Sequence, residues 1–222
     1  MVVTDIFNPK RFSSSRSDIR KKQEKYAAKF QGCKRVLDFG PGEGLFLELL
    51  RELRVEGLGV DMDSQAVAKA HEKGLQVVEA DGLVWISEQE EAFDGIFCSN
   101  VLEHLPPEKA AELLTQFVRL LSPGGLLILV VPNPRSVQML SETFWLDPTH
   151  VRFYPLRMLQ SGVTHLGLVV EESGDDPDTR VHPRSLWQWV KFFVRSCTLP
   201  RALRGGDEVF VCARAPRVSQ AE

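Results

Sequence analysis

The feature that most constrains the fold of this chain is a regular alternation of short apolar runs with helical patterns. Helical patterns over residues 44–53, 64–73 and 107–121 separate most of the runs. Strand, helix and strand in this order predict right-handed crossovers and a mostly parallel sheet. Five runs are apolar on successive residues, as in strands covered on both faces: RVLDFG, GLGVDM, LQVVEA, FDGIFCSN and GLLILVVP.

The segments on either side of these runs are also patterned. Residues 16–30 have the pattern of a charged helix, and residues 155–166 that of a second helix. GLVVEE and DEVFVCARA have the pattern of two further strands. Within the earlier part we expect Ser64 to be the N-cap of its helix. A chain of 222 residues is long enough for one large domain, so we expect a single domain over residues 1–222.

Composition and charge narrow the class of protein. The chain is 43% hydrophobic and 26% charged, and its formal net charge of −3 gives no reason to expect nucleic-acid binding. Its four cysteines have no metal-ligand spacing, which suits a reducing compartment. No apolar run approaches the roughly 18 residues of a membrane span, and we expect no signal peptide. These features predict a cytoplasmic protein.

Three glycines follow the first apolar run and precede the first helix. At such a junction backbone N–H groups point outward, and missing side chains let a ligand approach them. Gly40, Gly42 and Gly44 form a G-x-G-x-G pattern, whereas a dinucleotide loop would need its third glycine at Leu45. Glu43 lies inside the loop, where an acid suits a cationic cofactor such as S-adenosylmethionine better than a pyrophosphate. The alternative is a tight turn that binds nothing.

Two aspartates follow the next two strands in order. Asp61 ends the second strand, where a carboxylate can accept hydrogen bonds from both hydroxyl groups of a ribose. Asp81 and Gly82 follow the third strand, where a carboxylate can accept from an adenine amino group. Either aspartate alone is equally well explained as a helix cap or a turn residue. The two together, after a glycine loop, favour a nucleoside site.

Together these segments resemble the successive motifs of class I S-adenosylmethionine-dependent methyltransferases, of the type 11 and type 23 kind. The motifs are VLDFGPGEG, GVDMD, EADGL, FDGIFCSNVLEHLPP and LSPGGLLILVVPNP, and they cover about residues 30–135. The resemblance implies an α/β fold with a Rossmann-like, seven-stranded and mostly parallel sheet. It further implies helices on both faces of the sheet and a C-terminal antiparallel hairpin.

The resemblance also implies the roles of the cofactor-binding residues. Asp38 and the glycine loop would hold the methionine end of S-adenosylmethionine. Asp61, with the adjacent Met62, would bind the ribose, and Asp81 with Gly82 would bind the adenine. Asn100, at the end of the fourth strand, would line the same pocket. A nicotinamide-dependent reductase, or a binding module without turnover, is the alternative from another class of function.

Methyl transfer requires an acceptor nucleophile aligned with the reactive methyl group, and an oxygen nucleophile must also lose a proton. The candidates for this chemistry are Glu103 and His104, just past the fourth strand, and His150 beyond the fifth. Each of the three also has a structural explanation, as a loop-fixing or packed residue. Arg152 and Tyr154 are candidates for contact with the substrate, although Arg152 could equally pair with an acidic neighbour.

A divalent metal is a further possibility for this segment. Ubiquinone-pathway O-methyltransferases and small-RNA 2′-O-methyltransferases carry E-x-x-E-H at this place and bind a divalent ion. Here Asn100 stands where the first acid would be, followed by Glu103 and His104. Because one carboxylate is lost, affinity for Mg²⁺ should fall, and we expect no bound metal.

The second half of the chain bears on the acceptor. FWLDPTHVRFYPLRML resembles a stretch of methyltransferases associated with surface-polysaccharide synthesis. The resemblance implies O-methylation of a sugar hydroxyl or phosphate of a surface glycan or its lipid-linked precursor. A quinone-like or other lipid phenol is the alternative acceptor. We divide the domain into an N-terminal helical extension (1–30), a cofactor-binding core (30–135), an acceptor-side segment (136–166) and a basic aromatic insertion (174–206).

The insertion has an unusual charge pattern. No acidic residue occurs from Thr179 to Gly206, and the stretch LWQWVKFFV lies within it. We expect residues 180–204 either to pack over the core with a solvated basic stripe or to contact an anionic membrane surface peripherally. The second reading places the enzyme at the inner face of the membrane. The basic residues are Arg180, Arg184, Lys191, Arg195, Arg201 and Arg204.

Overall fold

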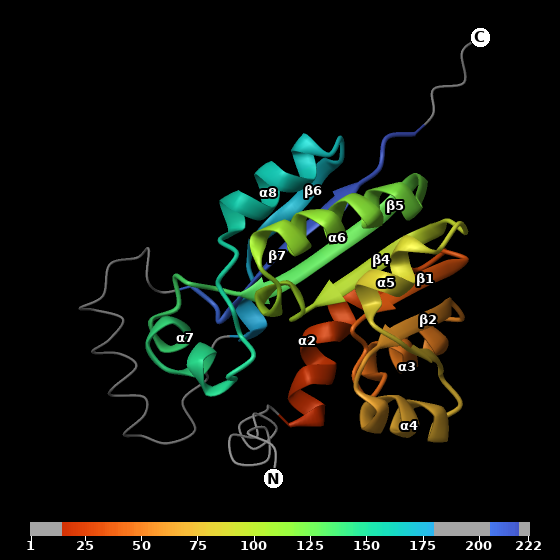
Figure 1. The fold of residues 1–222 in the computed structure, drawn as a ribbon, viewed down its shortest axis with the longest axis horizontal. Coiled ribbons are helices and arrows are strands. Elements are labelled where there is room, and N and C mark those ends of the chain that lie inside the picture. Colours follow the sequence, from red (N-terminus) through yellow and green to blue (C-terminus); the bar gives the residue numbers. More distant parts are fainter. Residues whose placement is uncertain (1–14, 180–204, 218–222) are drawn as a thin grey trace.

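The computed structural model describes residues 15–179 and 205–217, which form one sheet with helices on both faces (Figure 1). The seven strands lie in the order β3-β2-β1-β4-β5-β7-β6. Their bounds are Arg35–Phe39 (β1), Glu56–Asp61 (β2), Gln76–Glu79 (β3), Phe93–Ser99 (β4), Leu121–Pro132 (β5), Val169–Asp175 (β6) and Glu208–Arg214 (β7).

The pairing of the strands confirms the predicted topology. β1 pairs in parallel with β2 and β4, β2 with β3, and β4 with β5. β7 lies between β5 and β6 and is antiparallel to both, which gives the C-terminal hairpin. Because β7 runs against its neighbours, its first residue lies at the edge where the parallel strands end. Pro132, the last residue of β5, is paired with Glu208.

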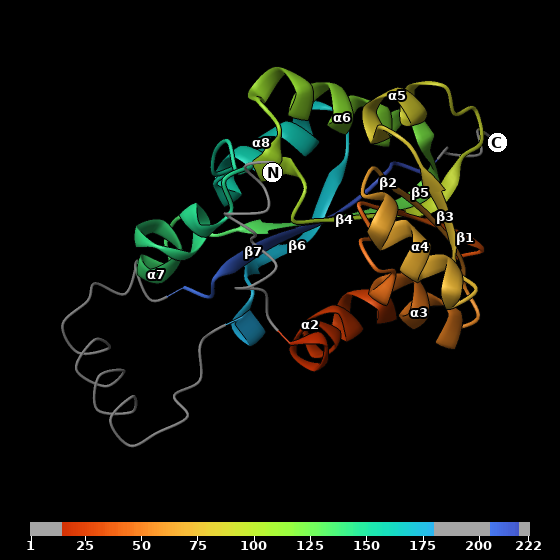
Figure 2. The same ribbon diagram turned by 60° about the horizontal axis from the view of Figure 1, so that its bottom comes forward.

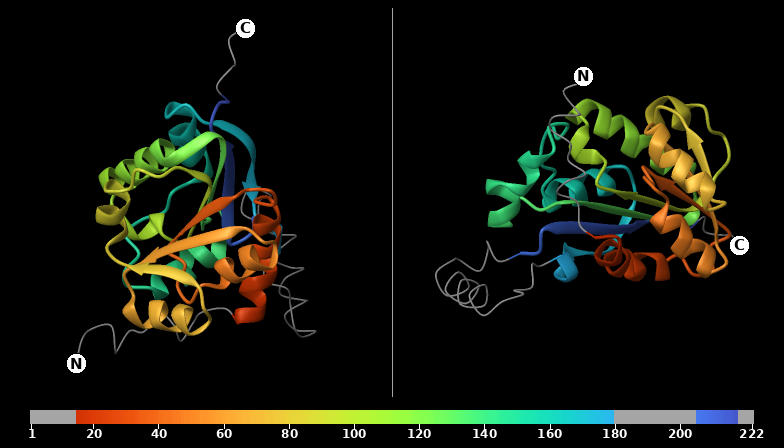
Figure 3. Two further views of the ribbon diagram at one scale, coloured as in Figure 1. Left: turned by 90° about the vertical axis from the view of Figure 1, so that its right-hand side faces the viewer. Right: turned by 90° about the horizontal axis from the view of Figure 1, so that it is seen from below.

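Helices form a layer on each face of the sheet (Figure 2). One layer contains α5, α6 and α8, and the other contains α2, α3 and α4; Figure 3 shows α6 and α2 on opposite sides of the sheet from two further directions. Their bounds are Arg16–Ala28 (α2), Leu45–Glu52 (α3), Ser64–Glu72 (α4), Gly82–Ser87 (α5), Pro107–Leu120 (α6) and Leu156–His165 (α8). Shorter elements are Leu102–His104 (η2), Val137–Ser141 (α7), Thr143–Leu146 (η3) and Pro177–Thr179 (η4).

Each helix layer encloses its own hydrophobic core against the sheet. Leu37 of β1 packs with Phe117 of α6 in one core. Its neighbour Val36 packs with Phe30 and Phe46 in the other. Successive residues of a strand point to opposite faces, so a strand covered on both sides is apolar at every position. This is why the central runs of the sequence do not alternate.

The predicted helix patterns agree with the structure within two residues, but two details differ. The N-cap of α4 is Asp63, whose carboxylate accepts hydrogen bonds from the backbone N–H groups of Gln65 and Ala66, so the expectation for Ser64 is wrong. The predicted first residue of the insertion, residue 174, still belongs to a strand. β6 continues to Asp175, which is still paired with β7.

Helix α2 is part of the layered fold rather than an appended extension. Its residue Tyr26 is buried and donates a hydrogen bond to the carboxylate of Asp176 over 2.7 Å. Lys25 forms an ion pair with the same carboxylate, which is completely buried. Arg20 forms an ion pair with Glu52 of α3 at 2.6 Å. These contacts fix α2 beside the edge where β7 begins.

Across residues 15–179 and 205–217, no helix combines the length and the apolar character needed to cross a membrane. The predicted membrane contact through residues 180–204 lies outside the described residues, and so does the first part of the predicted 1–30 extension.

Candidate active site

The glycine loop follows β1 and bends through backbone conformations that favour glycine. The φ angles of Gly40, Gly42 and Gly44 are +78°, +53° and +80°. A Cβ atom on Gly40 would lie 2.6 Å from Val101 Cγ2, and one on Gly44 would clash with Leu75 Cδ1. A Cβ on Gly42 would meet no atom of the described residues within 4 Å. Packing inside the protein therefore explains two of the glycines, and only Gly42 faces open space.

Asp61, at the end of β2, holds this loop in place. One carboxylate oxygen accepts a hydrogen bond from Gly42 N at 2.8 Å, and the other accepts from Asp63 N at 2.9 Å. Each oxygen keeps a further lone pair for a ligand hydroxyl group. The adjacent Met62 is 77% exposed, so an apolar surface lies open next to this carboxylate.

Asp38 in β1 is a buried carboxyl group that lacks a full set of partners. It is 2% exposed, and no group in the part of the chain that the structure describes donates a hydrogen bond to its Oδ2. Burial, reinforced by the nearby charge of Asp61, raises the pKa of Asp38 well above its ordinary value. A buried carboxyl of this kind is stabilised in its charged form by a positively charged partner. The ammonium group at the methionine end of S-adenosylmethionine fits that requirement.

Asp81 and Gly82 lie at the start of α5, after β3. The Asp81 carboxylate caps the helix by accepting from Leu83 N at 2.9 Å and from Val84 N at 3.3 Å. A Cβ on Gly82 would lie 2.5 Å from Phe39 Cζ, so close packing requires a glycine there. Capping and packing thus account for both residues locally, and Asp81 is also exposed at the edge that the glycine loop and Asp61 share.

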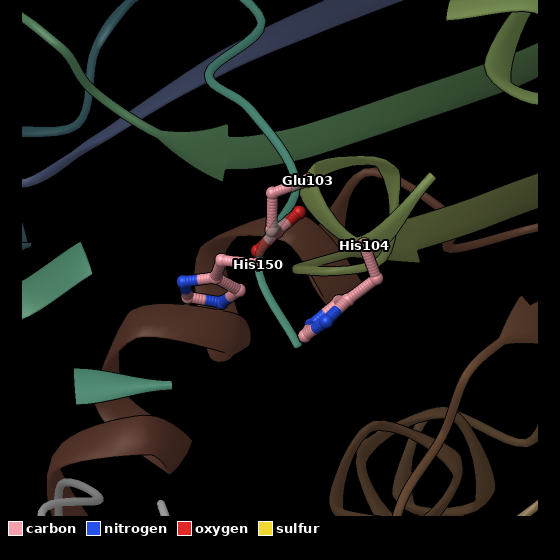
Figure 4. A group of neighbouring side chains, drawn as sticks. All are labelled: Glu103, His104 and His150. Carbon is pink, nitrogen blue, oxygen red and sulfur yellow. The ribbon is translucent and has the colours of Figure 1, made fainter. Parts of the chain in front are cut away.

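The three candidate catalytic residues come together just past the end of β4 (Figure 4). Glu103, His104 and His150 each offer one ligand atom, and these atoms lie within 4.8 Å of one another. Such a group has donors suited to a divalent metal ion. Glu103 is 1% exposed, and within residues 15–179 and 205–217 neither of its carboxylate oxygens has a hydrogen-bond partner. Burial, with smaller contributions from Glu208 and Asp147, raises the pKa of Glu103 to about 8.

Hydrogen bonds to the imidazole rings set their orientation. His150 Nδ1 lies 2.6 Å from the carbonyl oxygen of Phe144, which can only accept, so Nδ1 carries a proton. In neutral His150 the Nε2 atom is then a free acceptor. The two imidazole rings lie 4.7 Å apart between centroids. Burial, and next the charge of His150, lower the pKa of His104.

The hydroxyl group of Thr149 connects His104 to the carboxylate of Asp147. Thr149 Oγ1 donates to Asp147 Oδ1 at 2.6 Å and lies 2.8 Å from His104 Nδ1. Because a threonine hydroxyl has one proton, which goes to the carboxylate here, Thr149 accepts a hydrogen bond from His104 Nδ1–H. Thr149 therefore fixes the ring of His104.

The two residues proposed to contact substrate differ in their placement. Tyr154 is buried, and its hydroxyl group donates to the carbonyl oxygen of Leu105 at 2.8 Å, which favours a packing role. The guanidinium group of Arg152 lies over the Tyr154 ring, with 5.1 Å between Cζ and the ring centroid, and donates from Nε to the carbonyl of Phe153. Arg152 is half-buried beside the histidine cluster.

A pocket of about 210 Å³ lies between α2 and the sheet edge. Asn100 lines it with a φ of +55°, a strained conformation for a residue other than glycine. Asn100 Nδ2 lies 3.4 Å from Glu208 Oε1 across the pocket. The lining residues are Ile19, Lys22, Gln23, Tyr26, Ser99, Asn100, Val130 and Glu208.

Among these lining residues, only Asn100 was a candidate from the sequence. Glu208 follows Asp207 at the start of the apolar stretch DEVFVCARA and is the first residue of β7. Once that strand is taken as antiparallel, its first residue must lie at the edge where β4 and β5 end. Antiparallel pairing was thus the signal that could have identified Glu208.

Comparisons with known proteins identify the family of the chain. The family model described as a methyltransferase domain matches residues 11–173. A ubiquinone biosynthesis O-methyltransferase of Dechloromonas aromatica is 30% identical over 164 residues, which cover 71% of this chain and 62% of that protein. The corresponding protein of Xanthomonas oryzae pv. oryzae is 35% identical over 105 residues, or 45% of this chain and 43% of the relative. The chain thus spans less than half the length of the Xanthomonas relative that it matches.

Solved structures share the whole fold. A SAM-dependent methyltransferase from Archaeoglobus fulgidus is 27% identical, with a TM-score of 0.76 over 96% of this chain and 100% of that one. Magnesium protoporphyrin IX methyltransferase from Synechocystis PCC 6803 with bound SAM is 15% identical, with a TM-score of 0.61 over 90% of this chain and 80% of that one. The second likeness concerns the fold alone. By its family model and its fold, the chain belongs to the methyltransferase-domain family.

Proposed function

We propose that the enzyme methylates a hydroxyl oxygen of its acceptor. The observation that carries this proposal is the cluster of Glu103, His104 and His150 beside the sheet edge. An oxygen nucleophile must lose its proton during transfer, and a positioned imidazole or carboxylate can take it. His150 Nε2 is the best placed acceptor, since its Nδ1 is held by the Phe144 carbonyl. In this proposal Glu103 stabilises the charged His150 where it is ionised, at pH values above its raised pKa of about 8.

The proposed cofactor residues are those at the ends of β1 to β4. The cofactor supplies a methyl group already activated by its sulfonium charge. Asp38 binds the ammonium group at the methionine end, and Gly42 leaves open space beside the loop. Asp61 and Met62 bind the ribose, and Asp81 accepts from the adenine. Gly40, Gly44 and Gly82 shape these loops through packing, and Asn100 lines the methyl-transfer side.

Two acceptor classes suit this chemistry. The relatives from Dechloromonas and Xanthomonas are named for ubiquinone biosynthesis, which supports a quinone-like or other lipid phenol. The stretch over residues 144–159 resembles glycan-associated enzymes, which supports a sugar hydroxyl of a surface glycan or lipid-linked precursor. We place the phenol first, because the match to the Dechloromonas protein extends over 71% of the chain. In the proposal Arg152 contacts the acceptor beside the cluster.

The proposal is tested by replacing His150. His150→Ala should lower kcat by about 10²–10⁴-fold, the usual contribution of a general base, while the affinity for S-adenosylmethionine stays within twofold. Asp61→Ala is the opposite control and should weaken cofactor binding by about 2–4 kcal/mol, since it removes hydrogen bonds to a charged group. Calorimetry and a methyl-transfer assay separate the two effects. A His150→Ala variant that loses cofactor binding instead would contradict the catalytic assignment.

The same assay tests for a metal. Glu103, His104 and His150 would be its ligands, but the position of the first acid of the E-x-x-E-H pattern is Asn100. We expect full activity after treatment with EDTA. Loss of activity that Mg²⁺ restores would show that the cluster holds a metal ion.

A further inference from the structure

The pocket between α2 and the sheet edge lies on the side of the cofactor site where an acceptor is needed. In the strand order β3-β2-β1-β4-β5-β7, the glycine loop follows β1 and the proposed ribose and adenine residues follow β2 and β3. The pocket is built from the ends of β4, β5 and β7, on the opposite side of β1. If the nucleoside of the cofactor lies over the ends of β2 and β3, the methionine end of the cofactor points toward the ends of β4, β5 and β7.

Glu208 is held rigidly at this pocket through its backbone. Its N–H donates to Thr179 Oγ1 at 3.1 Å, and its carbonyl oxygen accepts from Asp176 N at 2.9 Å. Asp176 in turn holds Tyr26 of α2, so the strand and the helix that face each other across the pocket share one buried anchor. The wall that carries Glu208 is therefore preorganised.

The carboxyl group of Glu208 is poorly satisfied within the protein. Its hydrogen bond from Asn100 Nδ2 is long, at 3.4 Å. Burial raises the pKa of Glu208, and the charges of Asp176 and Asp207 raise it further against the effect of Lys22. Such a group gains from a ligand that donates hydrogen bonds, and it repels a ligand that brings another negative charge.

We propose that this pocket is the acceptor subsite and that Glu208 accepts a hydrogen bond from a hydroxyl group on an uncharged ring of the acceptor. Its volume of about 210 Å³ suits one small ring. Ile19 and Val130 supply apolar surface for the ring, whereas Gln23 and Asn100 supply polar contacts. This inference rests on the proposed oxygen methylation and deepens it. It selects a hydroxyl group over a phosphate as the part of the acceptor bound here.

A binding experiment tests the subsite without requiring turnover. The protein is saturated with S-adenosylhomocysteine and titrated, with ligand-observed NMR, against catechol and against methyl β-D-glucopyranoside. We expect one of the two rings to bind, which also distinguishes a phenol from a sugar. Glu208→Ala should weaken that binding about tenfold or more, the effect of losing one hydrogen bond to a charged group. Inorganic phosphate should not compete.

Matched controls make each outcome decisive. Glu172→Gln changes an acid on the neighbouring strand β6, paired with Lys29 and absent from the pocket lining, and should bind the ring normally. Affinity for S-adenosylhomocysteine should be unchanged in both variants. The proposal is overturned if neither ring binds, if Glu208→Ala binds as well as the native protein, if phosphate competes, or if Glu208→Ala loses the cofactor product. Failure of the His150 test with a normal result here would reject only the catalytic role of that histidine.

Discussion

At the scale of single residues, the buried carboxyl group of Asp38 links cofactor binding to pH. Its pKa is raised in the free protein, so the group holds a proton at pH values where an ordinary aspartate would not. An ammonium group bound beside it favours the charged form and lowers its pKa. Binding should therefore release a proton, and affinity should increase with pH until Asp38 is already ionised in the free protein.

Calorimetry in buffers of different ionisation enthalpy measures this proton directly. The native protein should show a buffer-dependent binding enthalpy below the raised pKa of Asp38, and Asp38→Asn should show none from this group. The variant should also bind more weakly, by about 1.5–3 kcal/mol for a lost charged hydrogen bond. Equal buffer dependence in the two proteins would mean that the ammonium group binds elsewhere.

A substitution at Gly42 can distinguish the cost of backbone strain from the loss of a ligand contact. Ala at position 42 would place its Cβ in open space at a φ of +53°, so we expect a stability cost of about 1–2 kcal/mol from the left-handed conformation alone. Gly32 is the matched control, because its φ is +89° and a Cβ there also meets nothing within 4 Å. Both alanine variants should unfold at similarly lowered urea concentrations. Only Gly42→Ala should lose cofactor affinity, and equal affinities would remove Gly42 from the binding site.

At the scale of elements, one buried group, the carboxylate of Asp176, contributes to the attachment of α2. Tyr26→Phe leaves the Asp176 carboxylate without its 2.7 Å hydrogen bond, and we expect a loss of about 1.5–3 kcal/mol in the free energy of unfolding. Tyr154→Phe is the comparison, since Tyr154 donates to a neutral carbonyl oxygen and should cost about 0.5–1.5 kcal/mol. Urea denaturation measures both. A smaller loss for Tyr26→Phe would mean that Lys25 and the backbone N–H of Asp178 together satisfy the Asp176 carboxylate.

The elements themselves were the most predictable part of the molecule. Unbroken apolar runs identify central strands, because each residue of such a strand packs into one core or the other. Helix ends were less predictable. Asp63 and Ser64 are adjacent, and both residue types are good N-caps. Only the structure shows that the side chain of Asp63 accepts the hydrogen bonds from the first turn of α4. Gly174 and Asp175 have no strand propensity, and their pairing with β7 extends β6 beyond its apolar run.

At the scale of the whole molecule, the shared position of the proposed cofactor residues at one sheet edge was predictable, because a parallel sheet brings strand ends together. The acceptor side was not, because its residues lie on segments joined only by the fold. Tyr26, Asn100 and Glu208 come from α2, the end of β4 and the start of β7, and no local pattern relates them. The sequence also does not show which side chains are exposed. The aromatic ring of Tyr154 suits a substrate contact, but the structure buries it.

Oxygen methylation by this protein can be measured directly with a labelled methyl group. The enzyme is incubated with S-adenosylmethionine labelled with ¹³C in the methyl group, together with catechol and methyl β-D-glucopyranoside. The products are then identified by NMR and mass spectrometry. We expect S-adenosylhomocysteine and a ¹³C-labelled methyl ether of one of the two rings, formed in equal amounts. The His150→Ala variant should form no detectable ether. A labelled methyl group on a ring carbon, or an ether formed at the native rate by His150→Ala, would contradict oxygen methylation with His150 as the base.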